Sequence, residues 1–274
     1  MTDLFGERIP EPGCLRQEFC EPPFSVLDTK TGLWQARKQK WRALGIRSEL
    51  GRDCVTFNLD KSTSIFDPAL CEVLYRWFTE EGDSVLDPFA GGSVRGIVAE
   101  SLGRRYTGID IRPEQIASNR EQADAIFGKG LGPRWVCGDS DKVLDGMGGG
   151  YDFVFSCPPY ADLEVYSDLT GDISNMDWAD FKAAYASIIA KACSKLKPGA
   201  LACFVVGEVR GKNGGFLGLV PFTVWAFRKC GMLYYNEAVL LNAVNSASMR
   251  AKGNMKSKKL VKIHQNILVF KKEA

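Results

Sequence analysis

The chain has 274 residues, 45% of them hydrophobic, which is enough to bury a full core, and we expect one α/β domain with extensions. Its formal net charge of +2 neither favours nor excludes nucleic acid. No apolar run reaches the roughly 20 residues that span a bilayer, and no signal peptide is evident. Nine scattered Cys and a single His argue against a bound metal and favour reduced thiols in a cytoplasmic protein.

The N-terminal 60 residues predict an arm in two parts. Residues 1–30 carry four prolines without clear periodicity, and we expect irregular structure there. Residues 34–52 (WQARKQKWRALGIRSELGR) predict a basic helix broken at Gly45. Two interpretations remain: a solvated helix whose Trp residues dock on the core, or a nucleic-acid contact in which Trp stacks on unpaired bases. The candidate phosphate-binding residues are Arg37, Lys38, Lys40 and Arg42.

A helix is predicted next, directly before the first strand. Asp67 and Pro68 read as an N-cap followed by proline at the first helical position. Apolar residues then recur at helical spacing, and Gly82 ends the segment.

Residues 84–94 (SVLDPFAGGSV) predict a short strand, a Gly-rich turn and a helix that starts at Ser93. Gly91 and Gly92 allow a tight turn and the close approach of a ligand. The segment lacks the Lys of a Walker A loop and the spacing of a dinucleotide fingerprint. Asp87 would repel a phosphate, so the turn suits a cationic or hydroxyl-bearing ligand.

Three successive strands end in an acid, namely Asp87, Asp110 and Asp139. Parallel strands bind ligands beyond their carboxyl ends, so the three acids predict one binding edge. Asp110 follows the glycine turn by roughly 20 residues, the place where α/β nucleotide folds hold ribose hydroxyls.

The fourth strand, residues 151–156, runs into Cys157-Pro158-Pro159-Tyr160. Neither proline donates an N–H, so the strand cannot continue in a central ladder. The pair leaves rigid carbonyl groups and holds Tyr160 out from the sheet edge.

DPFAGGS and CPPY together resemble the cofactor loop and the D/N/S-PPY motif of the amino-group DNA methyltransferases, including phage and bacterial site-specific methylases. The resemblance implies an α/β, Rossmann-like, seven-stranded sheet with helices on both faces and an antiparallel last strand, over residues 61–274. It implies S-adenosylmethionine as cofactor. The implied cofactor-binding residues are Phe66, Asp67, Asp87, Pro88, Phe89, Ala90, Gly91, Gly92, Asp110, Ile111, Asp139 and Ser140.

The same resemblance implies a catalytic set of Cys157, Pro158, Pro159 and Tyr160. Residue 157 and the Pro158 carbonyl would accept from an exocyclic amine, and Tyr160 would stack on a base swung out of the duplex. Cys157 departs from the usual Asp, Asn or Ser and is a weak acceptor. Its size is nearest to Ser, which favours N4 of cytosine over N6 of adenine. A nucleophilic Cys157, as in C5-cytosine enzymes, is the other interpretation.

The remaining chain alternates helices (178–196, 219–230) with strands (200–206, 233–241, 266–270). Before the first of these helices lies an acidic stretch, a solvated lid or a wall of the base pocket, with Asp162, Glu164 and Tyr166. A Gly/Ser/Asn-rich loop at 242–265 is either solvated or a DNA phosphate contact. Its candidate contacts are Arg250, Lys252, Lys256, Lys258 and Lys259.

These features predict a restriction-modification type DNA methyltransferase, a monomer or homodimer, with double-stranded DNA as partner and no contact with a membrane. Alternatives are methylation of an RNA base or of a protein glutamine, a catalytically silent DNA-binding subunit, and a small-molecule methyltransferase.

Overall fold

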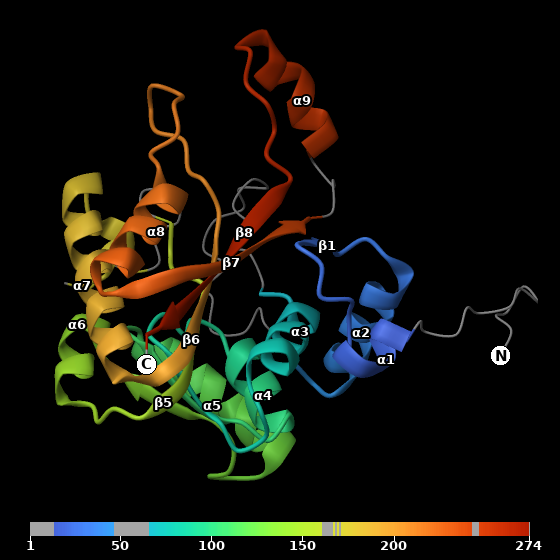
Figure 1. The fold of residues 1–274 in the computed structure, drawn as a ribbon, viewed down its shortest axis with the longest axis vertical. Helices are drawn as coiled ribbons and strands as arrows, with labels where there is room; N and C mark the ends of the chain where they lie inside the picture. Colours follow the sequence, from blue (N-terminus) through green and yellow to red (C-terminus); the bar gives the residue numbers. More distant parts are fainter. Residues whose placement is uncertain are drawn as a thin grey trace, which may run out of the picture.

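The computed structural model describes residues 14–46, 66–160, 167, 169, 171–242 and 247–273. Within these residues one eight-stranded sheet carries helices on both faces (Figure 1). The strands are β1 (Val26–Asp28), β2 (Ser84–Asp87), β3 (Arg105–Asp110), β4 (Arg134–Cys137), β5 (Tyr151–Ser156), β6 (Leu196–Val206), β7 (Met232–Leu241) and β8 (His264–Lys272). The α-helices are α1 (Cys14–Phe19), α2 (Gly32–Ala43), α3 (Pro68–Phe78), α4 (Val94–Ser101), α5 (Pro113–Phe127), α6 (Ser140–Val143), α7 (Trp178–Lys195), α8 (Leu219–Lys229) and α9 (Ala247–Lys256).

The strand order is β1-β7-β8-β6-β5-β2-β3-β4. All neighbouring pairs are parallel except the two made by β8, which runs antiparallel to β6 and β7. The chain moves outward from β2 to β4 and then returns to place β5 on the other side of β2. The carboxyl ends of β2 and β5 therefore form the topological switch point, where open α/β sheets bind ligands.

Alternate side chains of the central strands pack into two hydrophobic cores, one on each face of the sheet. In β5, Phe153 and Phe155 pack with helices α2 to α5, whereas Val154 packs with α7 and α8 on the opposite face. This two-residue alternation is what a strand buried on both faces requires. The predicted Rossmann-like sheet with an antiparallel last strand is confirmed.

The sheet has one strand more than predicted. β1 lies within residues 1–30, for which we expected irregular structure, and it pairs in parallel with the end of β7, Val26 opposite Val239. Three residues are too few to show a hydrophobic period, so only pairing with a distant strand defines this one.

Helix α2 packs on the core through both of its tryptophans. Trp34 and Trp41 are 1% and 7% exposed, so their faces cannot stack on bases, and the docked interpretation is correct. Their indole N–H groups donate to Asp67 and to Glu72 on the neighbouring segment. Arg37, a predicted phosphate contact, is half-buried and pairs with Glu72 at 3.1 Å.

Glu72 is the polar centre of the contact between α2 and α3. Its carboxylate accepts from Trp41 at 2.7 Å and pairs with Arg37 and Arg76. Burial alone would raise the pKa of Glu72, but the Trp41 hydrogen bond and the Arg37 charge reverse this, and the net pKa is lowered.

We expect Glu72→Gln to lower the free energy of unfolding by about 1–2 kcal/mol at pH 7, because charged hydrogen bonds across a buried contact are lost. A pKa lowered by folding adds stability above the unfolded value of about 4.3, and that stability is lost as the pH falls through the folded pKa. The difference in free energy of unfolding between wild type and Glu72→Gln, measured by urea denaturation, should therefore shrink as the pH is lowered. Exposed Glu121→Gln is the control, and a difference that persists in acid would contradict this account.

The 242–265 segment is not a loop throughout. Residues 247–256 form α9, which projects beyond the sheet in Figure 1, and β8 already begins at His264. Ser248, Gly253 and Asn254 lie within this helix, and their low helix propensity explains why the sequence did not predict it.

Candidate active site

A cavity of about 570 Å³ lies over the carboxyl ends of β2, β3, β4 and β5, within the usual size range of small-molecule sites. Most of the predicted site residues line it. These are Phe66, Asp67, Pro88, Phe89, Ala90, Gly91, Gly92, Asp110, Ile111, Asp139, Ser140, Cys157, Pro158, Pro159 and Tyr160.

The glycine turn is held from three sides. Gly91 has a φ of +52°, in the region that favours glycine, and its N–H donates to Asp110 at 2.9 Å. Its carbonyl accepts from Asn119 of α5 at 2.7 Å, and Pro88 O accepts from Ser140 at 2.5 Å. The loop after β2 is thus a preformed wall of the cavity, stabilised by the loops and helices that follow β3 and β4.

Asp87 is the exception among the predicted cofactor contacts. Its side chain is fully buried beneath the loop and does not line the cavity. It pairs with Arg95 of α4 at 2.6 Å and accepts hydroxyl hydrogen bonds from Tyr106 and Ser156. The expectation that Asp87 touches the ligand is therefore corrected: a buried cation and two hydroxyls already occupy its oxygens.

Arg95, which we did not single out from the sequence, joins the loop to the segment before α3. Besides Asp87, its guanidinium donates to the carbonyls of Phe89 and Ala90, and it lies 4.7 Å from the centre of the Phe66 ring. Burial lowers the pKa of Arg95, but the Asp87 carboxylate more than offsets this and the net pKa is raised. Arg95 thus stays charged and holds three cavity-lining residues in place.

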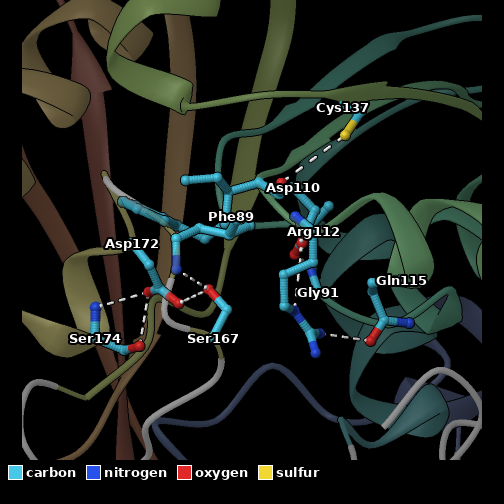
Figure 2. A network of polar contacts seen from close by, with 12 residues as sticks. Phe89, Gly91, Asp110, Arg112, Gln115, Cys137, Ser167, Asp172 and Ser174 are labelled. Carbon is cyan, nitrogen blue, oxygen red and sulfur yellow. Dashed lines mark hydrogen bonds and ion pairs between the residues drawn. The ribbon is translucent and has the colours of Figure 1, made fainter.

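Asp110 faces the cavity from the end of β3 (Figure 2). One of its oxygens accepts from Gly91 N–H, and the other accepts from Arg112 N–H at 2.9 Å. Burial raises the pKa of Asp110, and the nearby Arg112 charge opposes the shift. Two carboxylate oxygens offer about four acceptor positions, so this pair of backbone bonds leaves capacity for hydroxyl groups of a ligand.

A second polar cluster lies on the other side of Phe89 in Figure 2. Asp172 accepts from Ser167 and from the backbone and hydroxyl of Ser174, and it also lines the cavity. Nothing in the local sequence distinguished Asp172 from the other acids of that stretch. The predicted lid residues Asp162, Glu164 and Tyr166 lie outside the described residues.

The CPPY segment forms the opposite wall. Pro158 is buried, while Cys157, Pro159 and Tyr160 are half-buried. The hydroxyl of Tyr160 accepts from the side-chain amide of Gln265 on β8 at 2.9 Å. The sequence separation of 105 residues explains why no local pattern indicated this contact.

The chain's single histidine, His264, also lines the cavity. Burial and then the charge of Lys262 lower its pKa, which favours the uncharged ring. Lys38, predicted as a phosphate contact, lines the cavity too and pairs with Asp67 at 3.0 Å.

The remaining predicted DNA contacts fall into two groups. Lys40 and Arg42 are exposed on α2, and four basic residues are exposed on or just after α9: Arg250, Lys252, Lys256 and Lys258. Lys259 is half-buried against Gly214. In the parts of the chain that the structure describes, no group of three potential metal ligands is present. No helix among the described residues is long and apolar enough to cross a membrane.

Residues 31–121 match the family N6_N4_Mtase, a DNA methylase family. Over 47 residues the chain is 47% identical to the type II methyltransferase M2.DpnII of Streptococcus pneumoniae, a stretch that covers 17% of this chain and 18% of the relative. Over 48 residues it is 46% identical to the type II methyltransferase M.Cfr9I of Citrobacter freundii, covering 17% of this chain and 16% of that one. The matched stretches thus span less than a fifth of these relatives.

The fold is similar to a solved structure from Pyrococcus horikoshii of a protein proposed to be an RNA methyltransferase. The TM-score is 0.54 at 17% identity, over 87% of this chain and 100% of that chain. At this identity the likeness extends to the fold alone.

Proposed function

Because the family match and the curated relatives support an amino-group DNA methyltransferase, we propose that this chain transfers a methyl group from S-adenosylmethionine to an exocyclic amine of a DNA base. The target is N4 of cytosine or N6 of adenine. The observation that carries the proposal is that the glycine turn and CPPY line the same cavity. Methyl transfer requires the methyl donor and the acceptor base to lie side by side.

The residues present fit the cofactor. Asp110 has acceptor capacity for two ribose hydroxyls, and Asp139 and Ser140 stand at the next strand end, where an adenine amine would donate. Phe66 and Phe89 supply apolar surface, and the glycine turn leaves room for close approach. S-adenosylmethionine, when bound, supplies the electrophilic methyl group.

The chain's own residues position the acceptor. The amine of adenine or cytosine is a weak nucleophile because its lone pair is delocalised into the ring. Cys157 and the Pro158 carbonyl accept from it, which favours a more tetrahedral nitrogen, and Tyr160 stacks on the extruded base. Transfer is an in-line displacement governed by positioning and electrostatics, and the amine loses its proton afterwards. No strong general base is required.

The direct test is incubation with S-adenosylmethionine and mixed-sequence duplex DNA, followed by digestion to nucleosides and mass spectrometry. We expect N4-methylcytosine or N6-methyladenine. C5-methylcytosine would make Cys157 a nucleophile, and its replacement by Ser would then abolish activity. No methylated nucleoside, with cofactor binding intact, would overturn DNA as the substrate and favour RNA or protein amides.

Gln265 should act as a positioning residue for Tyr160. We expect Gln265→Leu to lower kcat about 5-fold with little change in cofactor affinity, because one hydrogen bond is worth about 1 kcal/mol. Tyr160→Phe removes the same bond, so the double variant should be no slower than either single one. Asn266→Leu, on the neighbouring residue that pairs with Glu237, is the matched control. Additive losses in the double variant would rule out this role.

A further inference from the structure

Two projections rise from the rim of the cavity. One is a hairpin of residues 209–217, closed by the bridge between Arg210 and Phe216, and the other is α9 with the segment that follows it. Figure 1 shows both extending past the same end of the sheet, the hairpin in orange before α8 and α9 in red. The residues at their bases, Val209 and Asn242 among them, line the cavity. The two projections therefore border the same cavity.

Both projections carry positive charge and no carboxylate. The hairpin holds Arg210 and Lys212, and residues 247–263 hold six more Lys and Arg, while neither stretch contains Asp or Glu. The chain as a whole has a net charge of only +2, so this concentration is local. Clustered cations beside a base-sized cavity match the phosphates that flank a target base.

Contacts at both ends of the hairpin hold it in place. At its base, the Glu208 carboxylate accepts from the N–H groups of Gly218 and Val220, which anchors it to the start of α8. At its turn, Lys259 lies so close to Gly214 that a β-carbon there would collide with the ammonium group. Lys259 thus connects the hairpin to the segment after α9.

The hairpin also holds an aromatic ring in solvent. Phe216 is 55% exposed, and the Arg210 guanidinium lies 4.1 Å from the centre of its ring. An aromatic ring that is more than half exposed to water gains little from burial in this chain alone. It is well placed to contact sugars or wedge against base pairs, as apolar side chains do in proteins that deform DNA.

We propose that the 209–217 hairpin is a DNA-binding element that works with α9, gripping the duplex on both sides of the extruded base. Lys212 contacts a phosphate, and Phe216 packs against the helix where the base has left the stack. This inference rests on the proposed function, and it assigns to the hairpin a contact that the basic residues around α9 alone do not provide.

The test compares two double variants of the full chain. Lys212→Ala/Phe216→Ala alters the hairpin. Lys129→Ala/Leu131→Ala removes the same charge and a similar apolar group from the exposed loop before the edge strand β4. Affinity for a labelled mixed-sequence duplex is measured by fluorescence anisotropy over a range of KCl concentrations. We expect the hairpin variant to bind about 10-fold more weakly, with a salt slope smaller by about 1, and the control to match wild type.

Affinity for S-adenosylmethionine is measured in parallel and should be unchanged in both variants, which establishes that each has folded. A hairpin variant that binds duplex like the control would overturn the inference while the proposed function stands. Weaker binding to structured RNA but not to duplex DNA would also overturn it. If wild type neither binds nor methylates duplex DNA, the proposed function itself fails and the inference falls with it.

Discussion

Asp87→Ala is expected to lower the free energy of unfolding by about 3–5 kcal/mol, because it leaves the buried Arg95 guanidinium without its counter-ion. The substitution also removes the carboxylate that accepts hydrogen bonds from the hydroxyl groups of Tyr106 and Ser156. Freed from Asp87, Arg95 can no longer hold the carbonyls of Phe89 and Ala90, so we expect cofactor affinity to fall as well. Urea denaturation measures the first effect and isothermal titration with S-adenosylmethionine the second.

Asp145→Ala is the matched control, since that carboxylate pairs with Lys191 at the surface and exposed pairs contribute little. Asp87→Asn retains a group of the same shape without the charge and should fall between wild type and Asp87→Ala. A loss of stability in Asp87→Ala no larger than that of the control would show that the Asp87–Arg95 pair does not organise the loop.

Tyr160→Ala should reduce kcat/KM for methyl transfer to DNA about 5- to 150-fold, because stacking on one base contributes about 1–3 kcal/mol. The cofactor loop lies on the opposite wall, so affinity for S-adenosylmethionine should stay within about 2-fold of wild type. Initial rates with tritiated cofactor give the first quantity, and titration gives the second.

The control is Tyr235→Ala, which removes an exposed tyrosine from β7. Equal loss of activity and cofactor affinity would move Tyr160 out of the base pocket and into the cofactor site. Unchanged activity would remove the stacking role altogether.

The elements themselves were predictable because their signals are local. Helix α3 begins at Pro68 after the N-cap Asp67, and strand β5 spans Tyr151–Ser156, as proline placement and the apolar run predict. The shared binding edge was predictable as well, since parallel strands that each end in an acid must bring those acids to one side. The glycine turn, Asp110, Asp139 and CPPY line the cavity for this reason.

Only the tertiary structure distinguishes the environments of the acids at the strand ends. Asp87 and Asp110 are each the last residue of neighbouring parallel strands, yet one faces a buried arginine and the other lines the cavity. The difference depends on Arg95 and Tyr106 arriving from other elements, which no periodicity encodes. The same holds for Gln265 beside Tyr160, for β1 on the sheet edge and for Lys259 against the 209–217 hairpin. Local patterns specify helices, strands and turns, whereas the partners of a polar side chain depend on packing between residues far apart in the chain.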